Sequence, residues 1–225
     1  MKYLLAMIQS GSVIGELICL FYAIIFTVQN KEKSFLGYIY LYLSLGLMMD
    51  LIWWTIDSKI ANRFYLLFLL SEFSFFSIWF YRILSGYSKV VIIFSLILFC
   101  SSIFGIWIDF IQLRLLYCLL LFESIYIVLF SFYYLYLKLH VSSTFTLIEM
   151  REFWALTGAA VCFVISIPFY CLDIYFTNFN LKYALNFSNE HIEVLRLINS
   201  IPLISDLFMY LFLIKAFKCK LPVMK

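Results

Sequence analysis

Five acidic residues lie inside long apolar stretches of the sequence, each in a different stretch. They are Glu16, Asp50, Glu72, Glu123 and Asp206. An ionised carboxylate in membrane hydrocarbon costs about 2.5 to 3.5 kcal/mol on insertion scales, so such a side chain is rarely turned toward lipid. Carboxyl groups in this setting take up protons, bind cations or act as general acids and bases. These five residues are therefore the candidates for chemistry.

Two of these acids have the same spacing from a preceding arginine. Glu72 follows Arg63 by nine residues, and Glu123 follows Arg114 by nine residues. If both arginines mark one membrane boundary, a helical rise of about 1.5 Å per residue places both carboxyl groups roughly 12 to 14 Å below it. A similar level is expected for Asp206, ten residues after Arg196, for Glu16 and for Asp50. The five acids are therefore predicted to form one layer.

No Lys, Arg or His is predicted at this depth to neutralise the layer. Several of the acids are therefore expected to be protonated at neutral pH or to bind a cation, because a buried carboxylate without a partner is costly. A purely structural alternative is that each protonated acid forms a hydrogen bond with a neighbouring helix and holds the bundle together. The sequence leaves both possibilities open.

Aromatic and polar residues lie near these acids at helical spacings. They are Trp53, three positions after Asp50; Trp79, seven after Glu72; Tyr126, three after Glu123; and Asn199 and Tyr210, which share a stripe with Asp206. Together with the acids they could line a pocket that opens to the outside and binds a small amphipathic ligand or a cation. However, aromatic residues make up 21% of the chain, so any helix face shows several of them. No catalytic residue, metal site or cofactor is predicted.

The elements that hold these residues follow from the composition. Of the 225 residues, 65% are hydrophobic and 13% are charged, and the mean hydropathy is +1.02. This leaves too little polar surface for a soluble domain, whereas a membrane helix needs about 20 mostly apolar residues. Seven such stretches lie near residues 4–28, 35–56, 64–84, 90–108, 115–137, 152–176 and 195–217. The sequence thus predicts an all-α polytopic membrane protein, a seven-transmembrane-helix bundle that forms a single domain over residues 1–225.

The distribution of Lys and Arg predicts the orientation of this bundle. With the N-terminus outside, ten basic residues fall in inner segments and six in outer segments. Because basic residues gather on the cytoplasmic side of membrane proteins, the N-terminus is predicted outside and the C-terminus in the cytoplasm. The tail KAFKCKLPVMK, residues 215–225, carries much of this bias and is expected to touch anionic lipid headgroups.

Proline and small residues predict bends and close helix contacts. Pro168 and Pro202 each follow a Ser-Ile pair, and each is expected to kink its helix while the serine satisfies the carbonyl that the proline leaves free. Small residues let neighbouring helices approach closely. Such contacts are predicted at the G-x-x-x-G motif of residues 11–15 and at Gly158, Cys162 and Ser166, which are four residues apart.

Several enzyme classes lack their signatures in this sequence. The two histidines, His140 and His191, are predicted in loops on opposite sides of the membrane, so no histidine pair could hold a metal inside it. Metalloprotease, serine-hydrolase and redox-cysteine motifs are missing as well. A hydrolase that acts on a lipid with paired carboxylates from Asp50, Glu72 or Glu123 stays possible. The net charge of +3 reflects membrane topology and gives no support to nucleic-acid binding.

Several short motifs occur in a fixed order along the chain. They are Asp50 late in the second helix, Glu72-Phe73 to Phe80-Tyr81 in the third, Glu123-Ser124 to Tyr133-Tyr134-Leu135-Tyr136 in the fifth, Phe153-Trp154 at the start of the sixth and Cys219 after the last. This order resembles a family of uncharacterised seven-span proteins common in Bacteroidetes. The resemblance covers nearly the whole chain and implies a seven-helix protein of a bacterial inner membrane, without implying an activity. Where that family carries Asn in the last helix, this chain has Asn199 and Asp206.

Together these features predict a multi-pass protein of the bacterial inner membrane that acts as a sensor or receptor-like module. Its outward-facing pocket would bind the ligand, and the inner loops, particularly residues 138–151, and the tail would contact a cytoplasmic signalling protein. One alternative is a small transporter or ion-coupled carrier that uses the same carboxylates. A further alternative is a membrane-embedded lipid-modifying enzyme.

Overall fold

The computed structural model describes residues 2–29, 38–55, 58–84, 86, 88–108, 113–140, 150–183 and 201–219. These residues form seven α-helices. The helices are α1 (Lys2–Gln29), α2 (Ile39–Thr55), α3 (Ser58–Ile83), α4 (Ser88–Ile108), α5 (Leu113–His140), α6 (Arg151–Tyr183) and α8 (Ile201–Lys218). The all-α fold class predicted from the composition is therefore confirmed for this part of the chain. His140, which was expected in a loop, is the last residue of α5.

Five of the described helices, α1, α3, α4, α5 and α6, are long and apolar enough to cross a membrane, and α2 is a shorter apolar helix. Many large apolar side chains on these helices face outward. On α4 alone they include Val90, Phe94, Ile97 and Phe104. Soluble monomers rarely expose apolar surface of this extent, whereas lipid would cover it. The described chain thus has the character of a multi-pass membrane protein.

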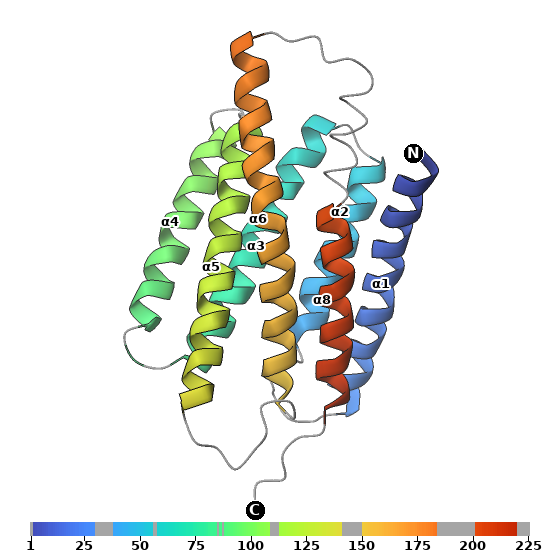
Figure 1. Ribbon diagram of the computed structural model, residues 1–225, viewed down its shortest axis with the longest axis vertical. Helices are drawn as coiled ribbons and strands as arrows, with labels where there is room; N and C mark the ends of the chain where they lie inside the picture. Colours follow the sequence, from blue (N-terminus) through green and yellow to red (C-terminus); the bar gives the residue numbers. More distant parts are fainter. Residues whose placement is uncertain are drawn as a thin grey trace, which may run out of the picture.

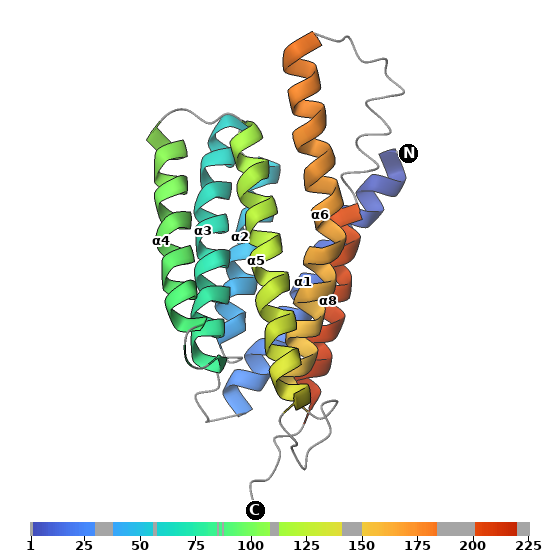
Figure 2. The same cartoon turned by 60° about the vertical axis from the view of Figure 1, so that its left-hand side comes forward.

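Six helices form a closed ring in which each packs against two neighbours. The order around the ring is α1, α2, α3, α5, α6 and α8, and α8 returns to α1. The remaining described helix, α4, stands outside the ring against α3, at the edge of the bundle in Figure 2. As Figure 1 shows, α1 begins at one end of the bundle and α8 ends at the other. The first and last helices of the chain therefore close the ring.

The turn between α3 and α4 depends on a glycine. Gly86 has a φ of 73°, in the left-handed region that side chains with a Cβ rarely adopt. The backbone N–H of Lys89 donates to the carbonyl of Gly86 at 3.2 Å and leads into α4. This tight turn reverses the chain, so that α4 runs antiparallel to α3 beside it.

Aromatic rings join α4 and α5 to α3. The ring of Phe73 on α3 lies nearly parallel to that of Phe99 on α4, with centroids 3.9 Å apart. On its other side, Phe73 packs against Tyr126 of α5 at 4.6 Å. Phe73 and Phe99 are almost fully buried. Rings of this size dominate core energetics, so this stack fixes the residues that follow Glu72 against α5.

Basic residues mark the end of the bundle at which α8 ends. Arg82, Lys138, Lys215 and Lys218 lie in the last turns of α3, α5 and α8, where cations interact favourably with the helix dipole. Arg151, the first residue of α6, donates from Nε to the carbonyl oxygen of Cys219 at 2.7 Å. Its guanidinium also lies 4.6 Å from the ring centroid of Phe26 on α1. This end, which we term the basic end, therefore ties α1, α6 and α8 together.

Small residues let α8 approach both of its neighbours. A Cβ built on Gly15 of α1 would lie 2.7 Å from Cδ2 of Leu207, and one built on Gly158 of α6 would lie 2.5 Å from Cβ of Phe212. Both distances are shorter than van der Waals contact, so only glycine fits without a shift of the neighbouring side chain. The close contacts predicted at the G-x-x-x-G motif and at Gly158 are confirmed.

The structure around the two prolines differs from the predicted one. Pro168 lies inside α6, and it leaves the carbonyl of Val164 without its helical N–H donor. Ser166 does not satisfy that carbonyl, because its Oγ donates to the carbonyl of Cys162 at 3.0 Å; the predicted role of this serine is wrong. Pro202 is the second residue of α8 as the structure describes it, Ile201–Lys218, a position near a helix start at which proline is common. The serine of its Ser-Ile pair lies outside the described residues.

Candidate functional site

The structure brings the five predicted acids together from five helices of the ring. Glu16 of α1, Glu72 of α3 and Glu123 of α5 are buried, with exposed fractions of 4%, 8% and 1%. Asp50 of α2 and Asp206 of α8 are half-buried. The charge of Glu16 interacts with those of the two aspartates and of Glu72, and the charge of Glu123 interacts with that of Glu72. We term this group the carboxyl cluster; its role as a ligand or ion pocket stays a prediction.

Glu16 enters the cluster through a contact with α2. Its Oε1 occupies the space that a side chain at Gly46 would take, so that a Cβ there would collide with the carboxyl group. Gly46 lies one turn before Asp50 on the same helix. The missing side chain at this position is therefore what admits the Glu16 carboxyl to the interior between α1 and α2.

Replacement of Gly46 by alanine should displace the Glu16 carboxyl. The cost should lie near the lower end of the roughly 1 to 3 kcal/mol typical of overpacking, because the carboxyl is the free end of a flexible side chain. In a Glu16→Ala background the same change should cost nothing, which gives a coupling of at least about 0.5 kcal/mol in a double-mutant cycle. Melting temperatures in detergent measure it, and Gly105→Ala is the control because no atom lies near that glycine. Strict additivity would contradict the contact.

Glu72 receives a hydrogen bond from a neighbouring helix. The hydroxyl of Tyr42 on α2 donates to its Oε1 at 2.6 Å, a length typical of bonds to an ionised carboxylate. The Tyr42 ring is held between Phe75, with centroids 5.3 Å apart and planes 17° apart, and Phe68. This stacking aims the hydroxyl at Glu72. Nothing in the sequence pointed to Tyr42, which is one of 17 tyrosines.

Glu123 has no comparable partner. Neither of its carboxyl oxygens accepts or donates a hydrogen bond within the described part of the chain. The adjacent Ser124 donates instead to the carbonyl of Leu120 at 2.8 Å. The hydroxyl of Tyr126, a predicted pocket residue, pairs with Ser77 at 3.1 Å. Glu123 is thus the least satisfied of the acids, and its interacting neighbour is Glu72.

Asp206 is held by α6. The thiol of Cys162 donates to its Oδ1 at 3.2 Å, and the same sulfur lies 3.5 Å from Oγ of Ser205. Ser166, one turn further along α6, lies 3.4 Å from the same Ser205 oxygen. The stripe of small residues therefore does more than let α6 and α8 pack closely, because it also supplies the polar partners of Asp206. The spacing of four residues between Gly158, Cys162 and Ser166 was the feature of the sequence that indicated the close helix contact.

The other predicted pocket residues have separate positions. Tyr210 is buried on α8 beside Gly15, and its hydroxyl interacts with the charges of Asp206 and Glu16. Trp79 is buried on α3 two turns beyond Glu72. Trp53 belongs to α2, but its side chain lies outside the described residues, as does the whole of Asn199. Tyr210 thus accompanies the carboxyl cluster, whereas Trp79 does not.

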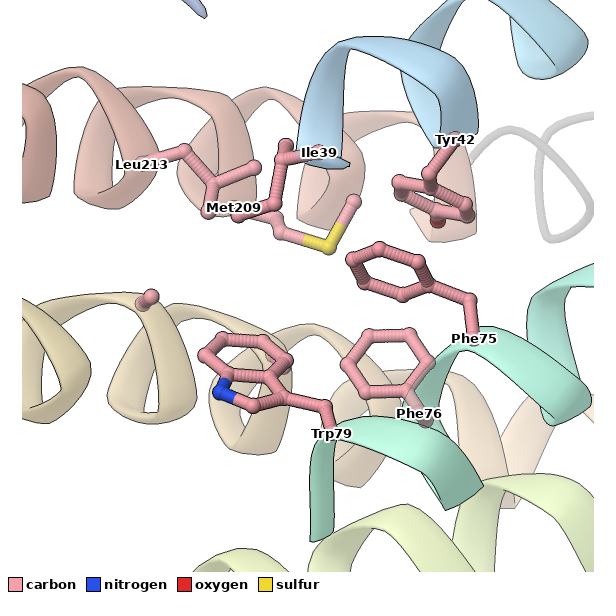
Figure 3. Close-up of a pocket in the computed structure, with 9 residues that line it drawn as sticks. Ile39, Tyr42, Phe75, Phe76, Trp79, Met209 and Leu213 are labelled. Atoms are coloured by element: carbon pink, nitrogen blue, oxygen red, sulfur yellow. The ribbon is translucent and has the colours of Figure 1, made fainter. Parts of the chain in front are cut away.

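Trp79 instead lines a small cavity between α2, α3, α6 and α8, shown in Figure 3. The cavity is lined by Ile39, Tyr42, Phe75, Phe76, Trp79, Ala155, Ala159, Met209 and Leu213. Its free volume of about 10 Å³ is near the least that one water molecule needs. The side chains that line it are apolar except for the hydroxyl of Tyr42, which reaches Glu72, and the indole N–H of Trp79. This cavity lies between the carboxyl cluster and the basic end, and it differs from the predicted outward-facing polar pocket.

Comparison with protein families, with curated proteins and with solved structures found no match. Among the described residues, no group of three or more His, Cys, Asp or Glu side chains is arranged to hold a metal ion. What the arrangement can do chemically therefore follows from the acids themselves. Buried carboxyl groups that interact with one another and have hydroxyl or thiol partners can exchange protons.

Proposed function

We propose that this protein is a sensor of the bacterial inner membrane, in which the carboxyl cluster receives the signal and the basic end passes it to a cytoplasmic partner. The observation that carries the proposal is that each acid of the cluster comes from a different helix. Five of the six ring helices each contribute one acid, so a change of charge acts on all five helices at once. The sixth, α6, holds Asp206 through Cys162.

The same proposal includes seven spans, with the N-terminus outside and the C-terminus in the cytoplasm. The basic residues in the last turns of α3, α5 and α8 support this orientation, since such residues gather on the cytoplasmic side. In this arrangement the basic end faces the cytoplasm. The tie from Arg151 to Cys219 and Phe26 would then carry a movement of α1, α6 or α8 to the surface that the partner contacts.

A proton- or cation-coupled carrier is the second candidate, and one observation favours it. The small cavity lies between α2 and α3 on one side and α6 and α8 on the other. Tyr42, which lines this cavity, donates a hydrogen bond to Glu72. If the two sides of the ring parted there, the carboxyl cluster would gain access to the opposite side of the membrane. Proton or sodium flux into liposomes that contain the protein would distinguish a carrier from a sensor.

Hydrogen exchange tests the sensor proposal. In proteoliposomes, the backbone amides at the basic ends of α6 and α8 should exchange at rates that differ between acidic and neutral pH, after correction for intrinsic exchange. The reason is that a charge change in the cluster alters packing in the ring. Glu72→Gln combined with Glu123→Gln keeps the size of both side chains, but neither glutamine can change charge, so this difference should shrink at least several-fold.

The matched control is Asp173→Asn. Asp173 is a half-buried acid of α6 outside the carboxyl cluster, and its replacement should leave the response intact. Equal exchange at the basic ends of the wild-type protein at both pH values, with the bundle folded, would reject the sensor. An unchanged response in the double variant would reject Glu72 and Glu123 as its origin.

A further inference from the structure

Glu72 and Glu123 form a pair of buried acids across the α3–α5 contact. Their charges interact, and their exposed fractions are 8% and 1%. Two buried carboxylates whose charges interact in a low-dielectric site cannot both be ionised without repulsion. The pair therefore needs a cation, or at least one proton.

Among the side chains that the structure describes, the titratable groups around the pair offer no positive charge. From the packed helices, the groups that interact with it are Glu16 of α1, Tyr42 of α2, Tyr65 of α3, Cys162 and Tyr170 of α6 and Asp206 of α8. All of these are neutral or negative. A metal ion would need several oxygen ligands at short range, and no such group is found in the described residues. A proton is the remaining way to balance the pair.

The hydrogen bonds distinguish the two acids. Tyr42 donates to Glu72 at 2.6 Å, which favours an ionised Glu72. Both oxygens of Glu123 lack a partner in the described part of the chain, although only 1% of the residue is exposed. An ionised Glu123 would leave two charged oxygens unsatisfied beside a second carboxylate. A protonated Glu123 avoids the cost of this buried charge.

We infer that Glu72 and Glu123 together hold a single proton, carried on Glu123, while Glu72 is the carboxylate to which Tyr42 donates. This inference rests on the proposed function, since it names the proton as the ligand that the sensor detects. On release, the O–H bond of Glu123 breaks, the bonding electrons stay on the carboxylate and the proton passes to water; uptake is the reverse. The small cavity lined by Tyr42 has a free volume near the least that one water molecule needs, and the hydroxyl of Tyr42 connects it to Glu72.

Infrared spectroscopy of the reconstituted protein tests the inference. At neutral pH the wild-type protein should show the carbonyl band of a protonated carboxylic acid. Glu123→Gln should remove the area of one acid from it. Glu72→Gln should leave that area unchanged but shift the frequency, because the neighbour of Glu123 becomes an amide. Asp173→Asn is the control and should leave the Glu123 band as it is.

Three results would overturn the inference. The first is an unchanged band area in Glu123→Gln, and the second is the loss of the area of one acid in Glu72→Gln. The third is a band that sodium chloride abolishes and choline chloride does not, which would indicate a cation site. If Glu123→Gln fails to fold, Glu123→Asp serves instead, because it should keep the area and shift the frequency. A band that Glu123→Gln removes, found together with pH-independent exchange at the basic end, would reject the sensor and leave the proton site standing.

Discussion

Replacing Gly158 by alanine should destabilise the bundle by about 1 to 3 kcal/mol, the usual range for overpacking in a tight interface. The added Cβ would lie 2.5 Å from Cβ of Phe212 and 3.4 Å from the carbonyl oxygen of Met209. Neither atom is the free end of a flexible side chain, so α6 and α8 must move apart. The melting temperature in detergent should fall accordingly.

Two further variants sharpen this prediction. Gly105→Ala on α4, where no atom lies within 4 Å, should be neutral or slightly stabilising, since alanine is the better helix former by about 1 kcal/mol. Phe212→Ala should not rescue Gly158→Ala, because alanine retains the Cβ that causes the collision. Equal melting temperatures for the two glycine variants would show that α6 and α8 are not in such close contact.

Replacing Glu123 by methionine should raise the stability of the protein while abolishing its infrared band. A buried polar group without a hydrogen bond costs about 1 to 3 kcal/mol, and an apolar residue of similar size removes that cost. Glu123 fits this description, with both oxygens unpartnered in the described residues. The melting temperature in detergent should therefore increase.

Glu72→Met is the matched comparison and should have the opposite sign. It would leave the buried Tyr42 hydroxyl without its acceptor, at a cost of about 1 to 3 kcal/mol. A methionine at position 123 that lowers stability as much as one at position 72 would mean that the Glu123 carboxyl is well satisfied. In that case the reason for placing the shared proton on Glu123 would be lost.

The helices could be predicted from the sequence because each apolar stretch is long and continuous. The stretch at 115–137 lies inside α5, Leu113–His140, and that at 90–108 nearly coincides with α4. The agreement is poorer for α6, predicted over 152–176, which continues to Tyr183. Hydrophobicity marks the part of a helix that suits lipid, whereas the helix itself can extend beyond that part. The neighbours of each helix were also not predictable, since nothing in the composition of α4 places it outside the ring.

The acids of the site could be predicted because a charge in an apolar stretch is conspicuous and its depth follows from helical rise. Their partners could not. Tyr42 and Gly46 meet Glu72 and Glu16 across helix contacts, and such contacts depend on which helices are neighbours and how each is rotated. Cys162 was recognised as part of a small-residue stripe, but its bond to Asp206 required the position of α8.

The contact between α1 and α8 has a consequence for how the protein is made. Domains form from the N-terminus onward during synthesis, yet Gly15 packs against Leu207, which is synthesised about 190 residues later (207 − 15 = 192). Until α8 is inserted, the small-residue face of α1 lacks one of its two neighbours, and Glu16 lacks the covering provided by Tyr210. If synthesis stopped before α8, Glu16 would lie close to lipid, at a cost of a few kcal/mol. The insertion of α8 therefore decides whether α1 is stably buried.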